Sequence, residues 1–198
     1  MIIGISGLAG SGKNTAADII AASHNVRCMA FADPLKEVLL QLFRDFGVRP
    51  EDLYGVSSDR AKVVEGLERP DRDPGGVTLR YLLQTLGTEW GREFVDRDLW
   101  VKIALRRAQR AKESGYSAVV FTDVRFENER DAVLAAGGEV WYIDRPSAGI
   151  FGNHLSERDM KKKSFRTGCT HVVPNKGTLN ELKTRVEHLA ACAIKEEQ

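Results

Sequence analysis

The sequence predicts an α/β protein in which a parallel sheet is covered by helices on both faces. Short apolar runs of strand length alternate with segments of helical periodicity along most of the 198 residues, as expected of parallel strands joined by crossover helices. A glycine-rich turn ending in a lysine, residues 7–13, separates the first apolar run from the first helical segment. A chain of this length buries about 70% of its unfolded surface, so its core needs no disulfides.

Composition and charge exclude several classes of protein. Lys and Arg total 29 against 28 Asp and Glu, a net charge of +1, which argues against a duplex-binding protein and against a general attraction to anionic membranes. The N-terminus has no basic lead, and no apolar run approaches about 20 residues, so we expect neither a signal peptide nor a membrane span. The three cysteines lack C-x-x-C spacing and the four histidines lack ligand spacing, which favours a reduced, cytoplasmic setting without a zinc site.

Apolar runs predict the strands, and capping residues delimit the helices between them. Asp33-Pro34 is a good helix start, because Asp caps helix N-termini and Pro suits the first helical position. Thr78 and Asp98 begin two further helices in the same way, and Gly47 and Gly115 end helices. The predicted strands are residues 2–6, 26–31, 118–121, 139–143 and 172–173. The predicted helices are residues 14–23, 33–46, 78–86, 98–114, 126–136 and 178–194.

Two polar stretches interrupt this alternation. Residues 49–76 hold three prolines, a Gly-Gly pair and charges of both signs, and we interpret them as a solvated, charged insert with at most a short helix. Residues 147–170 are polar and basic. We expect a single domain over residues 1–198 that carries both stretches.

The decisive motif is residues 7–15, GLAGSGKNT. It matches G-x-x-x-x-G-K between a predicted strand and a predicted helix, the context that a phosphate-binding P-loop requires. Glycines let backbone N–H groups converge on phosphate oxygens, and the helix N-terminus adds partial positive charge. Lys13 adds a full charge, worth about 4 kcal/mol at about 4 Å for an effective dielectric of roughly 20. A dinucleotide fingerprint fits less well, because G-x-G-x-x-G is not present.

Magnesium ligands are expected beside this loop. The residue after the P-loop lysine is usually Ser or Thr, but here it is Asn14, followed by Thr15. An amide oxygen can ligate a hard cation, or the metal can be held through water. Asp123 ends an apolar run and can also hold Mg²⁺, directly or through water. The alternative for Asp123 is that it caps the following helix.

Two further pairs are candidates for substrate contacts. An arginine beside a strand end, such as Arg125, can grip a phosphate with two hydrogen bonds, although an ordinary ion pair with Glu129 is the alternative. Asp33 and Lys36 begin a helix at the end of the sheet where α/β proteins bind ligands. There Asp33 can accept from a sugar hydroxyl and Lys36 can meet a phosphate; capping and solvation are the alternative.

Residues 80–92 are candidates to form a nucleotide pocket. Arg80 and Gln84 share one helix face, and Trp90 and Arg92 follow in the run LGTEWGR. Together they offer charge for a phosphate, a ring for stacking and an amide for a base edge. The alternative for Trp90 is a position in the core.

Arginines of the C-terminal third are candidates to act on a transferring phosphoryl group, where one Arg contributes about 10³–10⁵ in rate. Arg145 and Arg158 are the main candidates for this arginine. The basic stretch 147–170 can close as a lid that excludes water. Residues 175–178, NKGT, have Thr where guanine-reading N-K-x-D has Asp, which argues against a GTPase. Asn175 is instead a candidate to face an adenine.

With these motifs in order, the chain resembles the deoxynucleoside monophosphate kinases encoded by bacteriophages, within the P-loop nucleoside monophosphate kinase group. The runs LQTLGTE and DVRFENE are more telling than the P-loop, and this family often has Asn or Asp after the P-loop lysine. The segments that carry the resemblance are residues 7–15, 31–36, 80–92, 123–129, 154–157 and 175–182.

The resemblance implies a P-loop three-layer fold and an ATP- and Mg²⁺-dependent transfer of the γ-phosphate to a deoxynucleoside 5′-monophosphate, giving the diphosphate and ADP, in deoxynucleotide supply for DNA synthesis. It implies a lid containing residues 154–157, suggests a homodimer, and puts a phage-encoded enzyme in the host cytoplasm without stable nucleic-acid binding. The implied ATP-binding residues are Gly10, Ser11, Gly12, Lys13, Asn14, Thr15 and Asn175, with Asn14 and Asp123 at the metal. The implied acceptor residues are Asp33, Lys36, Arg80, Gln84, Trp90, Arg92, Arg125 and Glu129, and the implied catalytic residues are Lys13, Arg125 and Arg145.

Other functions stay open on sequence alone. Another P-loop small-molecule kinase, such as dephospho-coenzyme A kinase, would share the fold and differ in its acceptor. A nucleotide-binding module without transfer is the second alternative. A nucleic-acid-processing ATPase is the third, and the near-zero net charge and small size argue against it.

Overall fold

The computed structural model describes residues 1–55, 61–68, 76–148 and 163–195. Two compact units divide the chain: the first consists of Met1–Phe31 and Ala104–Gln198, and the second of Ala32–Ile103. Arg158 and residues 154–157 of the predicted lid lie outside the described residues. The prediction of one domain with an insert and a lid stays a prediction.

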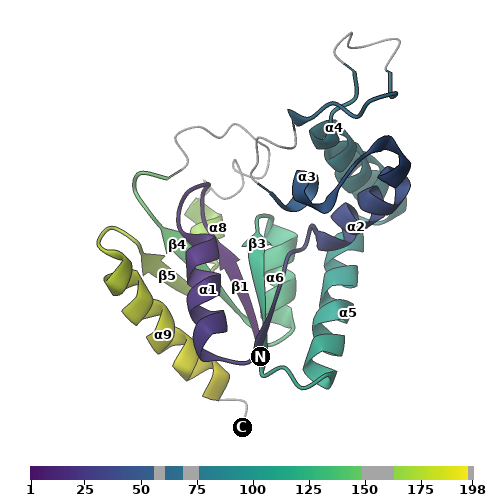
Figure 1. Cartoon of the computed structure of the whole chain (residues 1–198). Helices are drawn as coiled ribbons and strands as arrows, with labels where there is room; N and C mark the ends of the chain where they lie inside the picture. Colours follow the sequence, from purple (N-terminus) through teal and green to yellow (C-terminus); the bar gives the residue numbers. More distant parts are fainter. Residues whose placement is uncertain (56–60, 69–75, 149–162, 196–198) are drawn as a thin grey trace. The chain divides into compact units, whose positions relative to one another are not determined.

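The first unit is built on a five-stranded sheet, whose strands all run parallel (Figure 1). The order across the sheet is β2-β3-β1-β4-β5. The strands are β1 (Ile2–Ser6), β2 (Val26–Met29), β3 (Ala118–Val124), β4 (Glu139–Asp144) and β5 (His171–Pro174). The predicted α/β class with a parallel sheet is confirmed.

The position of β1 decides where a ligand can bind. The chain passes from β1 to β2 and β3 on one side of it, and then to β4 and β5 on the other. The order therefore reverses at β1, and in open α/β sheets ligands bind outside the carboxyl ends of the strands at such a point. The glycine-rich turn at residues 7–12 directly follows the carboxyl end of β1.

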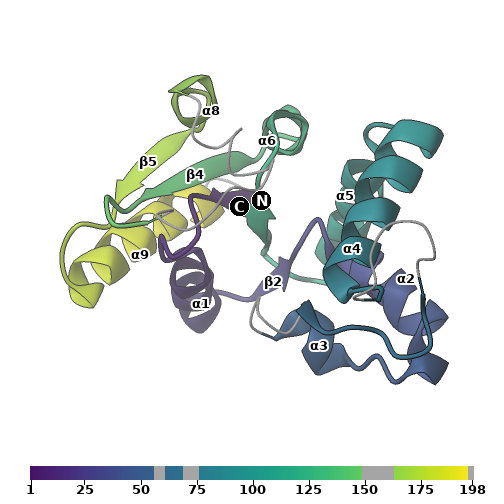
Figure 2. The same cartoon turned by 90° about the horizontal axis from the view of Figure 1, so that it is seen from above.

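Helices cover both faces of this sheet (Figure 2). Helices α1 (Lys13–Ser23) and α9 (Leu179–Lys195) pack against each other on one face. Helices α6 (Glu127–Ala135) and α8 (Lys163–Thr167) lie on the opposite face. This is the predicted three-layer arrangement. Helix α5 (Leu99–Glu113) begins in the second unit and continues into the first.

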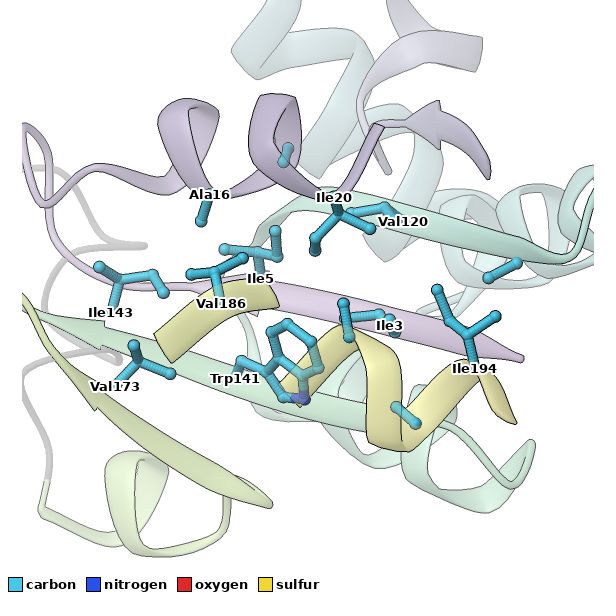
Figure 3. Packing of buried hydrophobic residues seen from close by; sticks show 14 of the residues in the cluster. Ile3, Ile5, Ala16, Ile20, Val120, Trp141, Ile143, Val173, Val186 and Ile194 are labelled. Atoms are coloured by element: carbon cyan, nitrogen blue, oxygen red, sulfur yellow. The ribbon is translucent and has the colours of Figure 1, made fainter. Parts of the chain in front are cut away.

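The main core lies between the sheet and the α1–α9 pair (Figure 3). Ile3 and Ile5 of β1 are completely buried there, and the small side chain of Ala16 lets α1 approach the sheet closely. Trp141 of β4 is also completely buried, and its Nε1 donates to Glu139 Oε2 at 2.7 Å, which satisfies its one polar atom. Each such apolar side chain contributes about 1.5–3 kcal/mol by leaving water, so β1 is held firmly beneath the glycine-rich turn.

The second unit is helical and has a core of its own. Its elements are α2 (Asp33–Leu42), η1 (Arg44–Phe46), α3 (Pro50–Tyr54), α4 (Leu79–Gln84) and the π-helix η3 (Thr85–Val95). Its buried residues are Leu39, Val48, Leu53, Val64 and Leu79. Two of them, Leu53 and Val64, fall in the stretch predicted to be solvated, and that part of the prediction is wrong: these apolar side chains close the core under α2 and α4.

Element boundaries differ from the prediction at several places. Strand β2 ends at Met29, and β3 continues to Val124 because it pairs with β1 up to Ser6. The N-cap of α2 is Ala32, so Asp33 is its first helical residue and forms an ion pair with Lys36 at 3.7 Å. Thr78 does cap α4, where its Oγ1 accepts from Tyr81 N at 3.2 Å. Within the described part of the chain, no helix combines the length and apolarity needed to cross a bilayer.

We predict that Leu53→Ala destabilises the protein by about 2–5 kcal/mol, because it leaves a cavity in the core of the second unit. The matched control is Leu42→Ala, whose side chain is 61% exposed and whose loss should change stability by about 0.5 kcal/mol or less. Urea unfolding of both variants measures the difference. Equal stability of the two variants would show that residues 49–76 add no core.

Candidate active site

The turn after β1 has a backbone that only glycine adopts easily. Gly7 has φ +139° and Gly12 has φ +100°, both in the region that side chains disfavour. A Cβ on Gly7 would lie 2.6 Å from both Ile143 O and Ser11 Oγ. The turn is therefore compact, and α1 begins at its end with Lys13. The first N–H groups of an α-helix have no carbonyl partner within the helix itself, and such a helix start can bind an anion.

The ammonium of Lys13 lies over this turn. Its Nζ donates to Gly7 O at 2.8 Å and to Leu8 O at 2.9 Å. A full positive charge is thereby held beside the partial charges of the α1 N-terminus, and both favour a phosphate.

Ser11 adds a polar group that a phosphate can satisfy. Its Oγ is buried, and among the described residues it has no hydrogen-bond partner. A buried hydroxyl left without a partner costs about 1–3 kcal/mol. A phosphate oxygen within the turn is a partner that this hydroxyl can take, so the turn fits a nucleotide phosphate tail.

Two residues predicted at the site brace the turn from neighbouring strands. Asn175, after β5, donates from Nδ2 to Ser11 O at 2.8 Å, and its own N–H donates to Asp144 O at 2.8 Å. Arg145, after β4, donates from Nη1 to Gly10 O at 3.4 Å. A contact between Asn175 and an adenine stays a prediction, but its amide is already engaged in fixing the turn.

Asp123 lies in an irregularity of β3, the strand that pairs with β1. Gly4 of β1 pairs with Phe121 and Ser6 pairs with Val124, so β3 carries one extra residue between these pairs. Such bulges re-aim side chains next to active sites. Asp123 Oδ1 accepts from Phe31 N at 2.7 Å, and the N-cap of α6 is Phe126. The alternative that Asp123 caps α6 is therefore wrong.

Glu129 fixes the backbone beside Asp123. Its side chain is buried, and Oε2 accepts from Arg125 N at 2.8 Å and from Phe126 N at 3.1 Å. The contact between Glu129 and Arg125 is thus made to the backbone, and it satisfies amides at the start of α6. Arg125 is held directly after the strand end, with its guanidinium carried by a rigid backbone.

The two residues predicted to hold magnesium, Asn14 and Asp123, lie on α1 and β3. Asn14 is exposed in the first turn of α1, and Asp123 lies at the carboxyl end of the neighbouring β3. In the described ranges no cluster of three or more His, Cys, Asp or Glu could hold a metal ion. Mg²⁺ usually keeps several of its waters and needs few protein oxygens, so the residue types of Asn14 and Asp123 suit it, and their binding of the metal stays a prediction.

The remaining predicted acceptor residues belong to the second unit. Lys36 of α2 pairs with Asp33 and lies over the ring of Tyr54, 4.4 Å from its centroid. Arg80 and Gln84 lie on α4, and Trp90 and Arg92 on η3. Trp90 is 48% exposed, so a core role for it is wrong.

Cys169 and Cys28 are not suited to act as nucleophiles. Burial raises the pKa of Cys169 to about 11, and its Sγ donates to Phe165 O at 3.3 Å. Burial also raises the pKa of Cys28. Both thiols therefore stay protonated at neutral pH and are poor nucleophiles.

Comparison with known proteins identifies the family. The family model for deoxynucleotide monophosphate kinase matches residues 71–186, more than half of the chain. The chain belongs to the deoxynucleotide monophosphate kinase family. It is therefore a kinase that transfers a phosphoryl group to a deoxynucleotide monophosphate, as the resemblance predicted. Dephospho-coenzyme A as the acceptor and a module without transfer are set aside.

Relatives of this kinase align along nearly its whole length. A protein of Acanthamoeba polyphaga mimivirus that carries the provisional name deoxynucleotide monophosphate kinase is 29% identical over 201 residues, 94% of each chain. The deoxynucleotide monophosphate kinase of Enterobacteria phage T4 is 24% identical over 238 residues, 94% of this chain and 97% of its own. Among solved structures, TT1252 from Thermus thermophilus is 18% identical over 96% of each chain, with a TM-score of 0.48.

Some features of the kinase site were missed by reasoning from the sequence. The bulge that presents Asp123 depends on pairing between strands far apart in the chain, and no local pattern marks it. The capping role of Glu129 had a signal, since an acidic residue three positions after an N-cap is typical of a helix start. The hydrogen bond from Asn175 to Ser11 joins residues 164 positions apart, and no signal in the sequence indicates it.

We predict that Asn175→Ala raises the KM for the nucleotide donor about fivefold, because one neutral hydrogen bond that holds the turn is lost. Thermal unfolding should change little, since Asn175 is outside the main core. The matched control is Asn180→Ala, at an exposed asparagine in the first turn of α9. Steady-state kinetics compare the two, and an equal KM in both would refute the bracing role.

Proposed function

We propose that this kinase uses ATP and Mg²⁺ and transfers the γ-phosphate to a deoxynucleoside 5′-monophosphate, giving the diphosphate and ADP. The observation that carries the proposal is the turn at residues 7–13. There the N-terminus of α1, the Lys13 ammonium and the Ser11 hydroxyl, which has no partner among the described residues, meet at the point where the strand order reverses. These groups match the charge and the acceptor oxygens of a triphosphate.

The donor side is assigned to the first unit. In this proposal residues 10–15 bind the phosphate oxygens, Ser11 through its hydroxyl because its N–H donates to Leu8 O at 3.1 Å, and Lys13 bridges the β- and γ-phosphates. Asn175 and Arg145 keep the turn in shape through Ser11 O and Gly10 O. Magnesium, held by Asn14 and Asp123, would supply neutralisation of charge on the phosphate oxygens.

The acceptor side is assigned to the residues that the family resemblance implies. Arg80, Arg92 and Lys36 provide positive charge for the acceptor phosphate. Trp90 and Gln84 provide a ring for stacking and an amide for the base edge, and Asp33 can accept from a sugar hydroxyl. Arg125 and Glu129 complete this set: Arg125 contacts the phosphate, and Glu129 works through the backbone that it fixes.

Transfer then needs little acid–base chemistry. An oxygen of the acceptor phosphate is already anionic, so it attacks the γ-phosphorus in line while the bond to the β,γ-bridging oxygen breaks, and ADP leaves with that electron pair. Rate enhancement comes from positioning the two nucleotides and from neutralising charge with Lys13, Arg125 and Arg145. The basic stretch 147–170 would close as a lid and keep water from the γ-phosphate.

We propose that the kinase works in the cytoplasm, which is that of the host cell if the protein is phage-encoded, as a homodimer, and without stable binding to nucleic acid or membranes. The net charge of +1 supports the last point, because proteins that hold polyanions by charge are strongly basic. Sedimentation equilibrium tests the homodimer, and a mass equal to 22.0 kDa at all concentrations would exclude it.

We predict that Lys13→Ala lowers transfer by at least about a thousandfold, because the largest fixed charge on the donor phosphates is removed. The fold should survive, since Lys13 lies outside the main core. The control is Lys183→Ala, at an exposed lysine of α9. Coupled ADP-release assays and far-UV circular dichroism follow both variants, and normal turnover in Lys13→Ala would refute its role.

A panel of acceptors tests the assignment of substrates. We predict that radiolabelled ATP yields labelled diphosphate with at least one deoxynucleoside 5′-monophosphate, and less with the matching ribonucleotide. Thin-layer chromatography of the products measures this. Hydrolysis of ATP without transfer to any deoxynucleotide would contradict the proposal, as would DNA-stimulated ATPase activity.

A further inference from the structure

The π-helix η3 is the least regular element of the second unit. It spans the eleven residues Thr85–Val95 and follows α4 directly. In this wide helix the bonds skip one more residue than in an α-helix, as between Asp96 N and Gly91 O at 2.9 Å. Such helices are rare and occur mostly as single turns at functional sites. A run of this length needs contacts from outside to hold it.

Trp100, in the first turn of α5, provides that contact. Its side chain is buried, and Nε1 donates to Gly87 O at 2.8 Å. The indole takes the place that a side chain at position 91 would fill. A Cβ on Gly91 would lie 2.5 Å from Nε1 and 2.8 Å from Cε2 of Trp100. Gly87 and Gly91 are themselves buried, so the ring is inserted against the backbone of η3.

The backbone that Trp100 holds carries two residues of the acceptor set. Trp90 and Arg92 are the neighbours of Gly91 on either side. The rings of Trp90 and Trp100 have centroids 6.4 Å apart and are tilted by 46°, so the buried indole also backs the exposed one. A change in the pitch of η3 would rotate both Trp90 and Arg92, because each additional residue per turn shifts the direction of the side chains that follow.

We infer that Trp100 is a positioning residue for the acceptor: its indole clamps η3 in the wide form and thereby directs Trp90 and Arg92 toward the acceptor monophosphate. This inference rests on the proposed roles of Trp90 and Arg92. Trp100 touches neither nucleotide in this account and acts through the backbone of η3. The glycine at position 91 is required by the same contact, because a Cβ there would overlap the indole.

The test is Trp100→Phe, which keeps an aromatic ring but removes the N–H that bonds to Gly87 O. We expect the KM for the deoxynucleoside monophosphate to rise about tenfold, because a buried carbonyl loses its partner, while the KM for ATP stays unchanged. Amide hydrogen exchange should accelerate in residues 85–96 and not in the sheet. The matched control is Trp141→Phe, which removes another buried indole N–H, bonded to Glu139 in the first unit, and should leave both KM values unchanged.

A second variant tests the contact itself. Gly91→Ala in the otherwise unchanged kinase should raise the acceptor KM, because the new methyl group displaces the indole. In the Trp100→Phe background the smaller ring leaves room, so the same substitution should have a several-fold smaller effect. Additive effects would overturn the inference, because residues in contact couple and independent ones do not. The comparison of the two single variants with the double variant remains informative if Gly91→Ala folds poorly. In that case the double variant should give a higher yield of folded protein than Gly91→Ala alone.

The outcomes separate this inference from the proposed function. An unchanged acceptor KM and unchanged exchange in Trp100→Phe would overturn the inference, and so would a parallel rise of both KM values. Arg92→Ala is measured alongside: if it leaves the acceptor KM unchanged, the acceptor assignment has failed. In that case amide hydrogen exchange in Trp100→Phe still tests whether Trp100 holds η3. Faster exchange confined to residues 85–96 would support this role, and unchanged exchange would refute it.

Discussion

The structure of the candidate site depends on one constraint: the turn after β1 must keep its backbone curved around the space that a phosphate tail would fill. Buried apolar residues of β1 and α1 hold both ends of the turn, since Ile5 and Ala16 belong to the same core (Figure 3). Gly7 permits the curvature, and Asn175 fixes the carbonyl of Ser11. N–H groups that are already held in place bind an anion without a conformational change of the backbone, and this increases their affinity for the anion.

The predicted site residues around the turn are also held in place by contacts with other residues. Asp123 is presented by a bulge, and Arg125 is placed by a buried carboxylate that bonds to the backbone. In the second unit, the indole of Trp100 packs on Gly91 and bonds to Gly87 O, and it holds the element that carries Trp90 and Arg92. The side chains assigned to substrates are thus supported by others that touch no substrate, as phosphoryl transfer requires when positioning and charge supply most of the rate.

The sequence predicted what local patterns encode. The parallel strands, the loop at residues 7–15, the cap at Thr78 and the family followed from periodicity, turn chemistry and short motifs. What it missed comes from contacts between distant residues. Leu53 and Val64 looked like chance apolar positions in a charged stretch, and only the approach of α2 and α4 makes them a core. The π-helix could not be predicted, because its wide turn depends on the indole of Trp100 rather than on the propensity of its own residues.

The most direct test is a crystal structure of the kinase with a non-hydrolysable ATP analogue and Mg²⁺. We predict that the β- and γ-phosphates lie within residues 7–13 and that Ser11 Oγ gains a phosphate oxygen as its partner. Lys13 Nζ should exchange its bonds to Gly7 O and Leu8 O for bonds to phosphate oxygens. A nucleotide bound elsewhere, with this turn and the Lys13 contacts unchanged, would contradict it.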